Sequence, residues 1–391
     1  MPWSETTAME QRVQFIRDWR SARLSIADLC ALYDISRKTG YKWIERYIEE
    51  GPDGLLERSH VAQTVHNKTL PEVEQAILAM RLAHPSWGPK KLLHKLGQRQ
   101  PRLVLPGRST VADILSRNGL ITQRPRRRTI GHPGKPNQQI LLPNDCWSAD
   151  FKGQFKTRDG CYCYPLTVTD NHSRFLLGCQ ALPGTLLEPS KIVFTRLFKQ
   201  YGLPRRIRTD NGVPFASHTL GRLSRLSAWW VRLGIFPEFI EPGKPQQNGK
   251  HERMHRTLKD ETTKPPAANS RAQQRKFNAF KREFNEERPH EALDMNTPAQ
   301  LYQPSDRPMP DKLPPLEYPD RFEVRYVSAN GGIRWKQQWV NVTTAVIGEY
   351  VGLEEIDDGL WDVYFGPLKL GRLLERHMRI EDHLGRLKRR V

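Results

Sequence analysis

Apolar positions in the first 60 residues recur at helical spacing and predict three short helices. Ser36 is placed as an N-cap for the third helix, over residues 37–47. Arg37, Lys38 and Lys42 lie near its start, where the recognition helix of a helix-turn-helix unit meets DNA. An ordinary three-helix bundle with a solvated basic face fits the same pattern, so both interpretations stay open. The predicted inward positions are Val13, Ile16, Trp19, Ile26, Leu29, Cys30, Tyr33, Trp43, Ile44 and Tyr47.

Residues 70–120 repeat this helical pattern. One helix runs to His84, a second follows Trp87-Gly88, and a third begins near Ser109. A second three-helix unit directly after the first favours DNA binding by both. Its predicted inward positions are Val73, Ile77, Met80, Leu82, Val111, Ile114 and Leu115.

From residue 145 to about residue 240 the pattern becomes rich in strands. Trp147 and Phe151 alternate with Asp150, which therefore points to the opposite face of its strand. Mixed strands and helices fit an α/β layer fold. The predicted strands are 147–151, 162–169, 175–179, one ending at Asp210, and 235–240, and the predicted helices are 190–201, 223–233 and one from about Gln246.

The last part of the chain begins with six prolines between residues 304 and 319, which predict a stiff connection. Alternating segments then favour a small β-barrel. Arg334, Trp335, Lys336 and Trp339 suit contacts with DNA or a second protomer, although the two tryptophans equally suit a plain core. The predicted strands are 322–327, 332–339, 345–353 and 360–365.

Charge narrows the possible partners, because 62 Lys and Arg against 43 Asp and Glu give a net charge of +19 and a pI of about 9.9. Such a chain is attracted to polyanions, with nucleic acid as the expected partner and an anionic membrane as the competing one. No apolar run approaches the roughly 20 residues that cross a bilayer, and the start lacks the layout of a secretory signal. We expect a soluble cytoplasmic protein with reduced cysteines and no membrane partner.

Residues 121–139 contain no acid and are interrupted by prolines and glycines, which argues against regular structure. Arg124, Arg126, Arg127 and Arg128 lie in this segment. We expect a basic linker that lies along DNA phosphates. The absence of acids disfavours the alternative of a merely solvated tether.

Three acids stand in distinctive settings: Asp150 in Trp-Ser-Ala-Asp-Phe, Asp210 in Thr-Asp-Asn-Gly, and Glu252 in Gln-Gln-Asn-Gly-Lys-His-Glu. Asn211-Gly212 predicts a tight turn, which would put the Asp210 carboxylate at the carboxyl end of a strand, where α/β sheets bind ligands. Three converging carboxylates can hold two Mg²⁺ ions against a phosphodiester, because Mg²⁺ prefers carboxylate oxygen.

Glu252 is followed by His255, Arg256 and Lys259 at helical spacing, so these residues are predicted to share its face and, with Lys250, to contact DNA. Taken singly, each of the three acids has rivals for a metal-binding role. These rivals are Asp170, Glu241, Asp260 and Glu261.

The motifs around the three acids, taken as a set, resemble the integrase-type core of bacterial insertion-sequence transposases. They are Trp147 to Phe151, Thr209 to Gly212 and Pro242 to Lys259. Residues 284–293, Phe-Asn-Glu-Glu-Arg-Pro-His-Glu-Ala-Leu, are similar to the segment that closes this core. Asp210 and Glu252 stand 42 positions apart, which is wider than is usual in retroviral integrases.

The resemblance implies an RNase H-like fold in which Asp150, Asp210 and Glu252 form an Asp-Asp-Glu triad with two Mg²⁺ ions, for which Mn²⁺ can substitute. It also implies a transposase that binds the terminal inverted repeats of its element. Such an enzyme cleaves the element ends and joins the freed 3′-hydroxyl to target DNA. A homo-oligomer assembled on double-stranded DNA, at the bacterial nucleoid, is expected as well.

We therefore predict a multidomain α/β protein with all-α helix-turn-helix units, an RNase H-like α/β core and a small β-barrel. The predicted parts are a helix-turn-helix domain at 1–60, a second such domain at 61–120, a basic linker at 121–140, the integrase-type core at 141–303, a proline-rich linker at 304–320, the barrel at 321–380 and a basic tail at 381–391.

Two other functions fit much of this sequence. A DNA-binding regulator of transposition could retain the domains with a catalytically silent core, but the intact triad argues against it. A nuclease that cuts without joining would have nearly the same sequence.

The linker interpretation predicts that Arg126→Ala weakens binding to all DNA sequences similarly. Loss of one phosphate contact should reduce the slope of log affinity against log salt by about one unit. Binding measured at several salt concentrations on element-end DNA and on random DNA tests this. A changed sequence preference would show that Arg126 reads bases.

Overall fold

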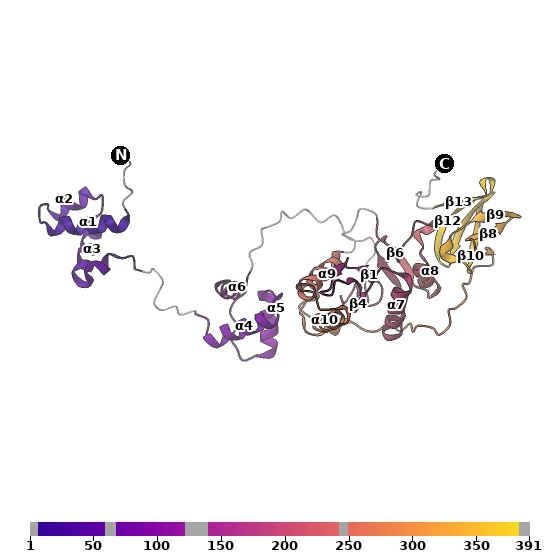
Figure 1. Ribbon diagram of the computed structural model, residues 1–391, viewed down its shortest axis with the longest axis horizontal. Coiled ribbons are helices and arrows are strands. Elements are labelled where there is room, and N and C mark those ends of the chain that lie inside the picture. The colour runs from indigo at the N-terminus through magenta and orange to yellow at the C-terminus, as the bar shows by residue number, and fades with distance from the viewer. Residues whose placement is uncertain (1–6, 59–67, 122–139, 242–248, 383–391) are drawn as a thin grey trace. The chain divides into compact units, whose positions relative to one another are not determined.

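The computed structural model describes residues 7–58, 68–121, 140–241 and 249–382. The chain divides into two compact units, Met1–Thr69 and Leu70–Val391 (Figure 1). Each unit has hydrophobic cores of its own. Within the described ranges, no helix is both long and apolar enough to cross a membrane.

The first unit contains the three predicted helices, α1 (Ala8–Arg20), α2 (Ile26–Leu32) and α3 (Arg37–Glu50), and then the 3-10 turn η1 (Gly51–Leu55). Ser36 is the N-cap of α3, since its hydroxyl accepts a backbone N–H of the first turn. The three helices pack around one core, which confirms the helical pattern. Its buried members are Phe15, Ile16, Leu29, Cys30, Trp43, Ile44 and Leu55.

The prediction that Val13 lies in the core of this unit is wrong. Val13 is 48% exposed, whereas Phe15 is buried. The buried face of α1 is centred on Phe15 and Ile16, so a residue three positions before Ile16 falls at the exposed margin of that face.

The second unit begins with another three-helix bundle, α4 (Pro71–Ala83), α5 (Pro89–Arg99) and α6 (Arg108–Arg117). Its core contains the predicted residues apart from Leu82, which is 65% exposed in the last turn of α4. Trp87 is fully buried, and its indole N–H donates to the Glu283 carboxylate at 2.8 Å. This hydrogen bond ties the bundle to the part of the chain that follows it.

Six strands form the central sheet: β1 (Trp147–Phe151), β2 (Phe155–Lys156), β3 (Tyr162–Asp170), β4 (Leu176–Leu182), β5 (Arg206–Thr209) and β6 (Phe236–Phe239). Their order is β2-β3-β1-β5-β6, with β4 beside β3. β1 runs antiparallel to β3 and parallel to β5. The sheet is therefore mixed, as the predicted α/β layer fold requires.

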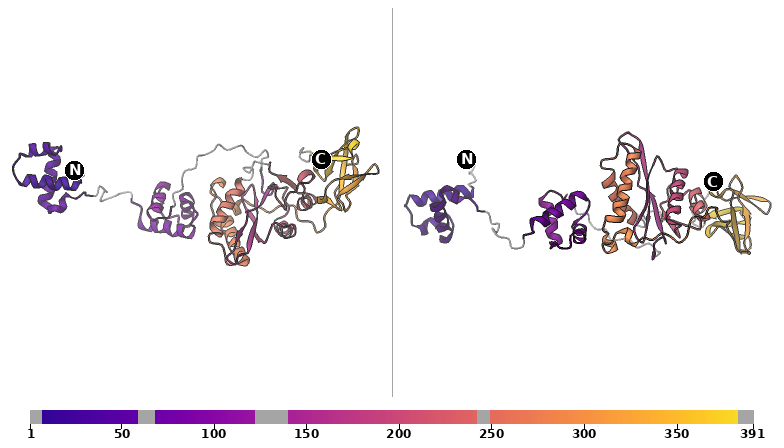
Figure 2. Two further views of the ribbon diagram at one scale, coloured as in Figure 1. Left: turned by 45° about the horizontal axis from the view of Figure 1, so that its top comes forward. Right: turned by 90° about the horizontal axis from the view of Figure 1, so that it is seen from below.

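Helices cover both faces of this sheet (Figure 2). The helices α7 (Leu187–Tyr201) and α8 (Arg225–Arg232) pack on the face that carries Trp147 and Ala149. On the other face lie α9 (Gly249–Thr262) and α10 (Ser270–Arg282). Between these layers β1 is buried until Asp150, which is partly exposed. The shorter helical turns are η2 (Leu220–Arg222), η4 (Glu283–Glu287), η5 (Glu291–Leu293), α11 (Pro298–Leu301), η6 (Thr344–Val346) and η7 (Glu375–His377).

The C-terminal region is rich in strands: β7 (Glu323–Tyr326), β8 (Gly332–Trp335), β9 (Gln338–Asn341), β10 (Tyr350–Asp357), β11 (Leu360–Phe365), β12 (Leu368–Leu374) and β13 (Arg379–Asp382). Five of them form an antiparallel sheet in the order β13-β12-β11-β10-β7, and β8 and β9 form a hairpin. Within the described residues the two edge strands do not pair with each other, so a closed barrel is not formed by strand pairing. The hairpin contacts both edge strands.

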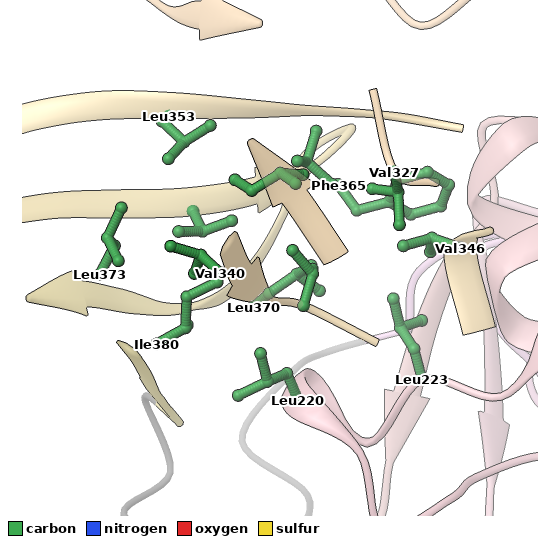
Figure 3. Packing of buried hydrophobic residues seen from close by; sticks show 14 of the residues in the cluster. Leu220, Leu223, Val327, Val340, Val346, Leu353, Phe365, Leu370, Leu373 and Ile380 are labelled. Carbon is green, nitrogen blue, oxygen red and sulfur yellow. The ribbon is translucent and has the colours of Figure 1, made fainter. Parts of the chain in front are cut away.

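This region shares its core with the preceding α/β layer. Leu220 and Leu223 lie in the same hydrophobic cluster as Val346 and Leu370 (Figure 3). The proline-rich connection is also held to the core, where Ser305 N donates to Tyr201 O at 2.8 Å. The strand-rich region is therefore packed against the α/β layer rather than tethered to it.

The segment 332–339 is a hairpin and not the single predicted strand. Lys336 and Gln337 form its turn, with φ angles of 43° and 65°. Consecutive positive φ angles are typical of a mirror-image turn, which usually contains Asn and Gly. Because neither residue occurs here, the sequence gives no sign of the turn.

Gly54→Ala should destabilise the first unit. A Cβ at this position would lie 2.2 Å from the carbonyl oxygen of Arg46, which belongs to the backbone of α3. Overpacking against backbone costs on the order of 1–3 kcal/mol. The measurement is hydrogen exchange of α1 to α3 amides, whose protection should fall.

Gly97→Ala is the matched control, because its nearest neighbour would be Leu105 Cδ1 at 3.6 Å. Alanine inside a helix is favoured over glycine by about 1 kcal/mol, so this variant should gain protection in α5. Equal protection of the first unit in Gly54→Ala and in wild type would contradict the close packing of η1 on α3.

Candidate active site

Asp150 and Asp210 lie side by side at one edge of the sheet. β1 and β5 are adjacent parallel strands in which Ala149 pairs with Thr209, and the two acids are the next residues on each. The Asp210 carboxylate accepts the backbone N–H of Gly212 at 3.1 Å, which holds it at the turn after β5. This is the carboxyl end of both strands, where α/β sheets form ligand sites.

Glu252 lies exposed in the first turn of α9, on the face of the sheet to which Asp150 points. Burial, the charge of Asp210 and, more weakly, the charge of Glu252 raise the pKa of Asp150 to about 7. Like charges raise the pKa of a carboxyl group only at short range. The charges of both Asp210 and Glu252 therefore reach Asp150.

Two buried histidines hold α9 against β3 beside Asp150. His251 Nε2 and His255 Nε2 lie 2.8 and 2.6 Å from Thr167 Oγ1, and His251 Nδ1 lies 2.7 Å from Thr169 Oγ1. Thr167 Oγ1 also donates to the backbone oxygen of Asp150 at 3.0 Å. Burial lowers the pKa of both imidazoles, that of His251 to about 3, so both are neutral.

The predicted DNA contact of His255 is not supported, because this residue is only 3% exposed. Its Nδ1 faces the Asp150 carboxylate at 3.6 Å. The buried face of α9 also contains Met254 and Leu258, so the apolar positions turn His255 toward the sheet. Sequence spacing alone gives the residues that share a face and does not say which face is buried.

The other predicted DNA contacts are exposed where the structure describes them. Arg37, Lys38 and Lys42 lie in the first half of α3, and Arg256 and Lys259 lie on the exposed side of α9. The predicted contacts Arg124, Arg126, Arg127 and Arg128 lie outside the described residues. Lys250 is exposed and donates to the backbone oxygen of Asn171 at 3.2 Å.

Three of the rival acids are engaged elsewhere. Asp170 is fully buried and accepts backbone N–H groups from Asn144 and Ser173. Glu261 pairs with Arg288, and Asp260 pairs with Lys264. These contacts explain these three acids as structural or surface groups.

The residues around Asp150 offer two possible sets of ligands for a divalent ion. Asp150, His251 and His255 place potential ligand atoms within 4.8 Å of one another. Both nitrogens of His251, however, already bond to threonine hydroxyls. Carboxylate oxygens suit hard ions such as Mg²⁺ better than imidazole does, so the set Asp150, Asp210 and Glu252 fits this ion better.

Asp150→Asn should stabilise the metal-free protein by an amount that grows with pH. The folded-state pKa of about 7 lies above the ordinary value of 3.8, so between these values only the unfolded chain ionises and wild type loses stability as pH rises. The slope is at most about 1.4 kcal/mol per pH unit and levels off above the folded pKa. Thermal unfolding in EDTA across this pH range measures it.

Glu188→Gln, on the exposed first turn of α7, is the control and should show no such slope. A stability difference between Asp150→Asn and wild type that stays constant with pH would contradict the crowding of the three carboxylates.

Family models match most of the described chain. Two integrase core domain models match residues 141–245 and 233–298. A helix-turn-helix model matches residues 11–60, and a homeodomain-like model matches residues 39–115. The C-terminal domain model of IS481 family transposases matches residues 322–377.

Solved structures of retroviral integrases are also similar to parts of the chain. The HTLV-2 integrase catalytic core domain in complex with magnesium is 18% identical, with a TM-score of 0.34, over 42% of this chain and 100% of that one. A chain from the structure of the simian T-cell lymphotropic virus intasome in complex with PP2A regulatory subunit B56 gamma is 18% identical, with a TM-score of 0.36, over 75% of this chain and 97% of that one. At these TM-scores, the fold assignment rests on the strand order and the family models.

Two curated relatives come from insertion elements. A protein of IS476 from Xanthomonas euvesicatoria is 33% identical over 45% of this chain and 50% of its own length, so the chain spans half of that relative. A protein of IS407 from Burkholderia multivorans is 26% identical over 61% of this chain and 84% of its own length. Together, the matched models and these relatives support a bacterial insertion-sequence transposase with an integrase-type core.

Proposed function

We propose that this protein is a DDE transposase that binds the terminal inverted repeats of its insertion sequence and catalyses metal-dependent strand cleavage and strand transfer. The observation that carries the proposal is the pairing of Ala149 with Thr209, which sets Asp150 beside Asp210. Glu252 on α9 supplies the third carboxylate. An integrase-type core belongs to the polynucleotidyl transferases, and this arrangement supports that chemistry.

The three carboxylates suit a pair of Mg²⁺ ions, with Mn²⁺ as a substitute. The raised pKa of Asp150 supports this, because like charges crowded in a partly buried site are relieved by cations. When bound, such ions activate the attacking hydroxyl or water and stabilise the leaving oxygen. Asp150, Asp210 and Glu252 would hold them.

The protein's own groups then position the DNA and the acids. Gly212 N orients Asp210, and His251 and His255 fix the start of α9. Arg256 and Lys259 offer positive charge on the exposed side of this helix. These residues bind and orient rather than transfer protons.

DNA ends would be recognised mainly by the helical parts. The exposed Arg37, Lys38 and Lys42 of α3 suit a recognition helix, and the arginines between residues 121 and 140 suit phosphate contacts. The predicted domain boundaries are part of this proposal. So is a role for the C-terminal β-rich region in binding DNA or a second protomer. A homo-oligomer that assembles on element ends and target DNA completes it. A nucleoid location in the bacterial cytoplasm follows from the same function.

The alternative is a catalytically silent DNA-binding regulator of transposition. It would keep the helical units and need no acid cluster. The clustering of three acids in a chain with a net charge of +19 favours catalysis over this alternative. A nuclease that cuts DNA without strand transfer would differ from the proposed transposase only in its products.

Purified protein, Mg²⁺ or Mn²⁺ and a plasmid that carries the DNA flanking its own gene test the proposal. Wild type should cut at the element ends and give joined products, whereas Asp150→Asn should lose at least about a thousandfold in rate, since a metal ion contributes several kcal/mol. End binding should remain nearly unchanged, because it rests on the helical units.

Glu188→Gln is the control and should retain activity. Binding to the ends without metal-dependent cleavage by wild type would favour the regulator. Cleavage without joined strands would favour the nuclease.

A further inference from the structure

A cavity of about 80 Å³ lies beside the start of α9, and five of its lining residues are cations. This volume has room for several water molecules or a small anion. The lining cations are Lys91, Arg174, Lys250, Arg253 and Arg288. Because Arg253 follows Glu252 directly, the cavity adjoins the candidate active site without containing its acids.

The cations converge from four separate parts of the fold. Lys91 comes from α5, Arg174 from the turn between β3 and β4, and Arg288 from the residue after η4. Lys250 and Arg253 come from the first turn of α9. Arg174 has a φ of 63°, a conformation that non-glycine residues adopt infrequently, so its side chain is aimed at the cavity at some backbone cost.

Acids pair directly with only one of these five cations among the described residues. Arg288 pairs with Glu261 at 2.8 Å and with Glu283 at 3.8 Å. Asp170, the acid in the lining, accepts hydrogen bonds from Asn144 and Ser173. In the parts of the chain that the structure describes, no carboxylate lies within ion-pair distance of Lys91, Arg174 or Arg253.

Instead, the cations repel one another. Burial, followed by the charge of Arg288, lowers the pKa of Lys91 to about 8, although the charges of Glu283, Glu291 and Glu261 oppose this shift. Burial and the charge of Arg253 also lower the pKa of Arg174. Partly buried charges of one sign are unfavourable unless an opposite charge joins them. The protein thus keeps a destabilising group of cations at a place where a ligand could neutralise it.

We propose that this cavity binds a phosphate group, and that its occupant is a backbone phosphate of the DNA strand held at the candidate active site. Arginine and lysine together are typical of phosphate recognition. Lys250 and Arg253 are exposed, whereas Lys91 and Arg174 are partly buried and Arg288 is buried, so the cavity is open on the side of α9. The choice of DNA as the source of the bound phosphate rests on the proposed function. The anion site itself does not depend on that function.

The position of Lys91 gives this site a structural consequence. α5 belongs to the second helical bundle, and the other four cations belong to the α/β layer. A phosphate in the cavity would bond to both parts at once. DNA binding would then strengthen the contact that Trp87 and Glu283 already make between them.

The anion site is tested with the full-length protein, carrying Asp150→Asn and free of metal, so that no chemistry is needed. Inorganic phosphate is titrated against chloride of equal ionic strength, and the unfolding midpoint is measured. The double variant Lys91→Gln/Arg174→Gln should need at least about tenfold more phosphate for the same shift. Lys199→Gln, an exposed cation on the opposite side of the sheet, should behave like the parent protein.

In phosphate-free buffer, Lys91→Gln should raise the unfolding midpoint, because it removes a repelled cation. A purely structural role for Lys91 predicts a lower midpoint. Arg174→Lys keeps the charge and should retain most of the phosphate effect, which separates loss of charge from misfolding. If Lys91→Gln/Arg174→Gln responded to phosphate like the parent, the anion site would be wrong.

The claim that the occupant is a DNA phosphate is tested with element-end duplexes that carry one neutral methylphosphonate at each position in turn. A methylphosphonate at one position should weaken DNA binding by the parent protein about tenfold. The same methylphosphonate should cause no further loss of DNA binding by Lys91→Gln/Arg174→Gln. A phosphate effect that depends on these two residues, without any such coupled position, would overturn DNA as the occupant and assign the cavity to free phosphate. Failure of cleavage alone would bear on the proposed function and leave both binding results intact.

Discussion

The packing of α9 on the sheet through His251 and His255 is the interaction on which the candidate site depends. Both imidazoles are neutral and share the hydroxyl of Thr167, which also bonds to the backbone of Asp150. This network fixes the first turn of α9, and with it Glu252, relative to β1. Acids that repel one another could not hold this arrangement themselves, so the neutral hydrogen bonds beneath them must.

The mixed pairing of β1 sets the other half of the site. Because β1 is parallel to β5, the residues that follow Ala149 and Thr209 lie at the same edge of the sheet. Helices on both faces bury Trp147 to Ala149 of β1, while Asp150 remains partly exposed. A small acidic centre thus lies in a chain with a net charge of +19, which suits a protein that must attract a phosphodiester and also bind cations beside it.

Local signals in the sequence were enough to predict much of this. The Ser36 cap, the alternation around Asp150 and the Asn211-Gly212 turn are all visible within a few residues. The turn at Lys336 and Gln337 could not be predicted, since its conformation comes from the strands that flank it. The burial of His255 and the cavity cations likewise follow from tertiary packing, which brings together segments such as α5 and the turn at Arg174.

The central claim is that Asp150, Asp210 and Glu252 form one metal site. Electron paramagnetic resonance of Mn²⁺ titrated into the full-length protein tests it most directly, with Asp150→Asn, Asp210→Asn, Glu252→Gln and the control Glu188→Gln. The account predicts that each of the first three variants weakens Mn²⁺ binding at least about tenfold and that Glu188→Gln does not. Wild-type Mn²⁺ affinity in both Asp210→Asn and Glu252→Gln would contradict it.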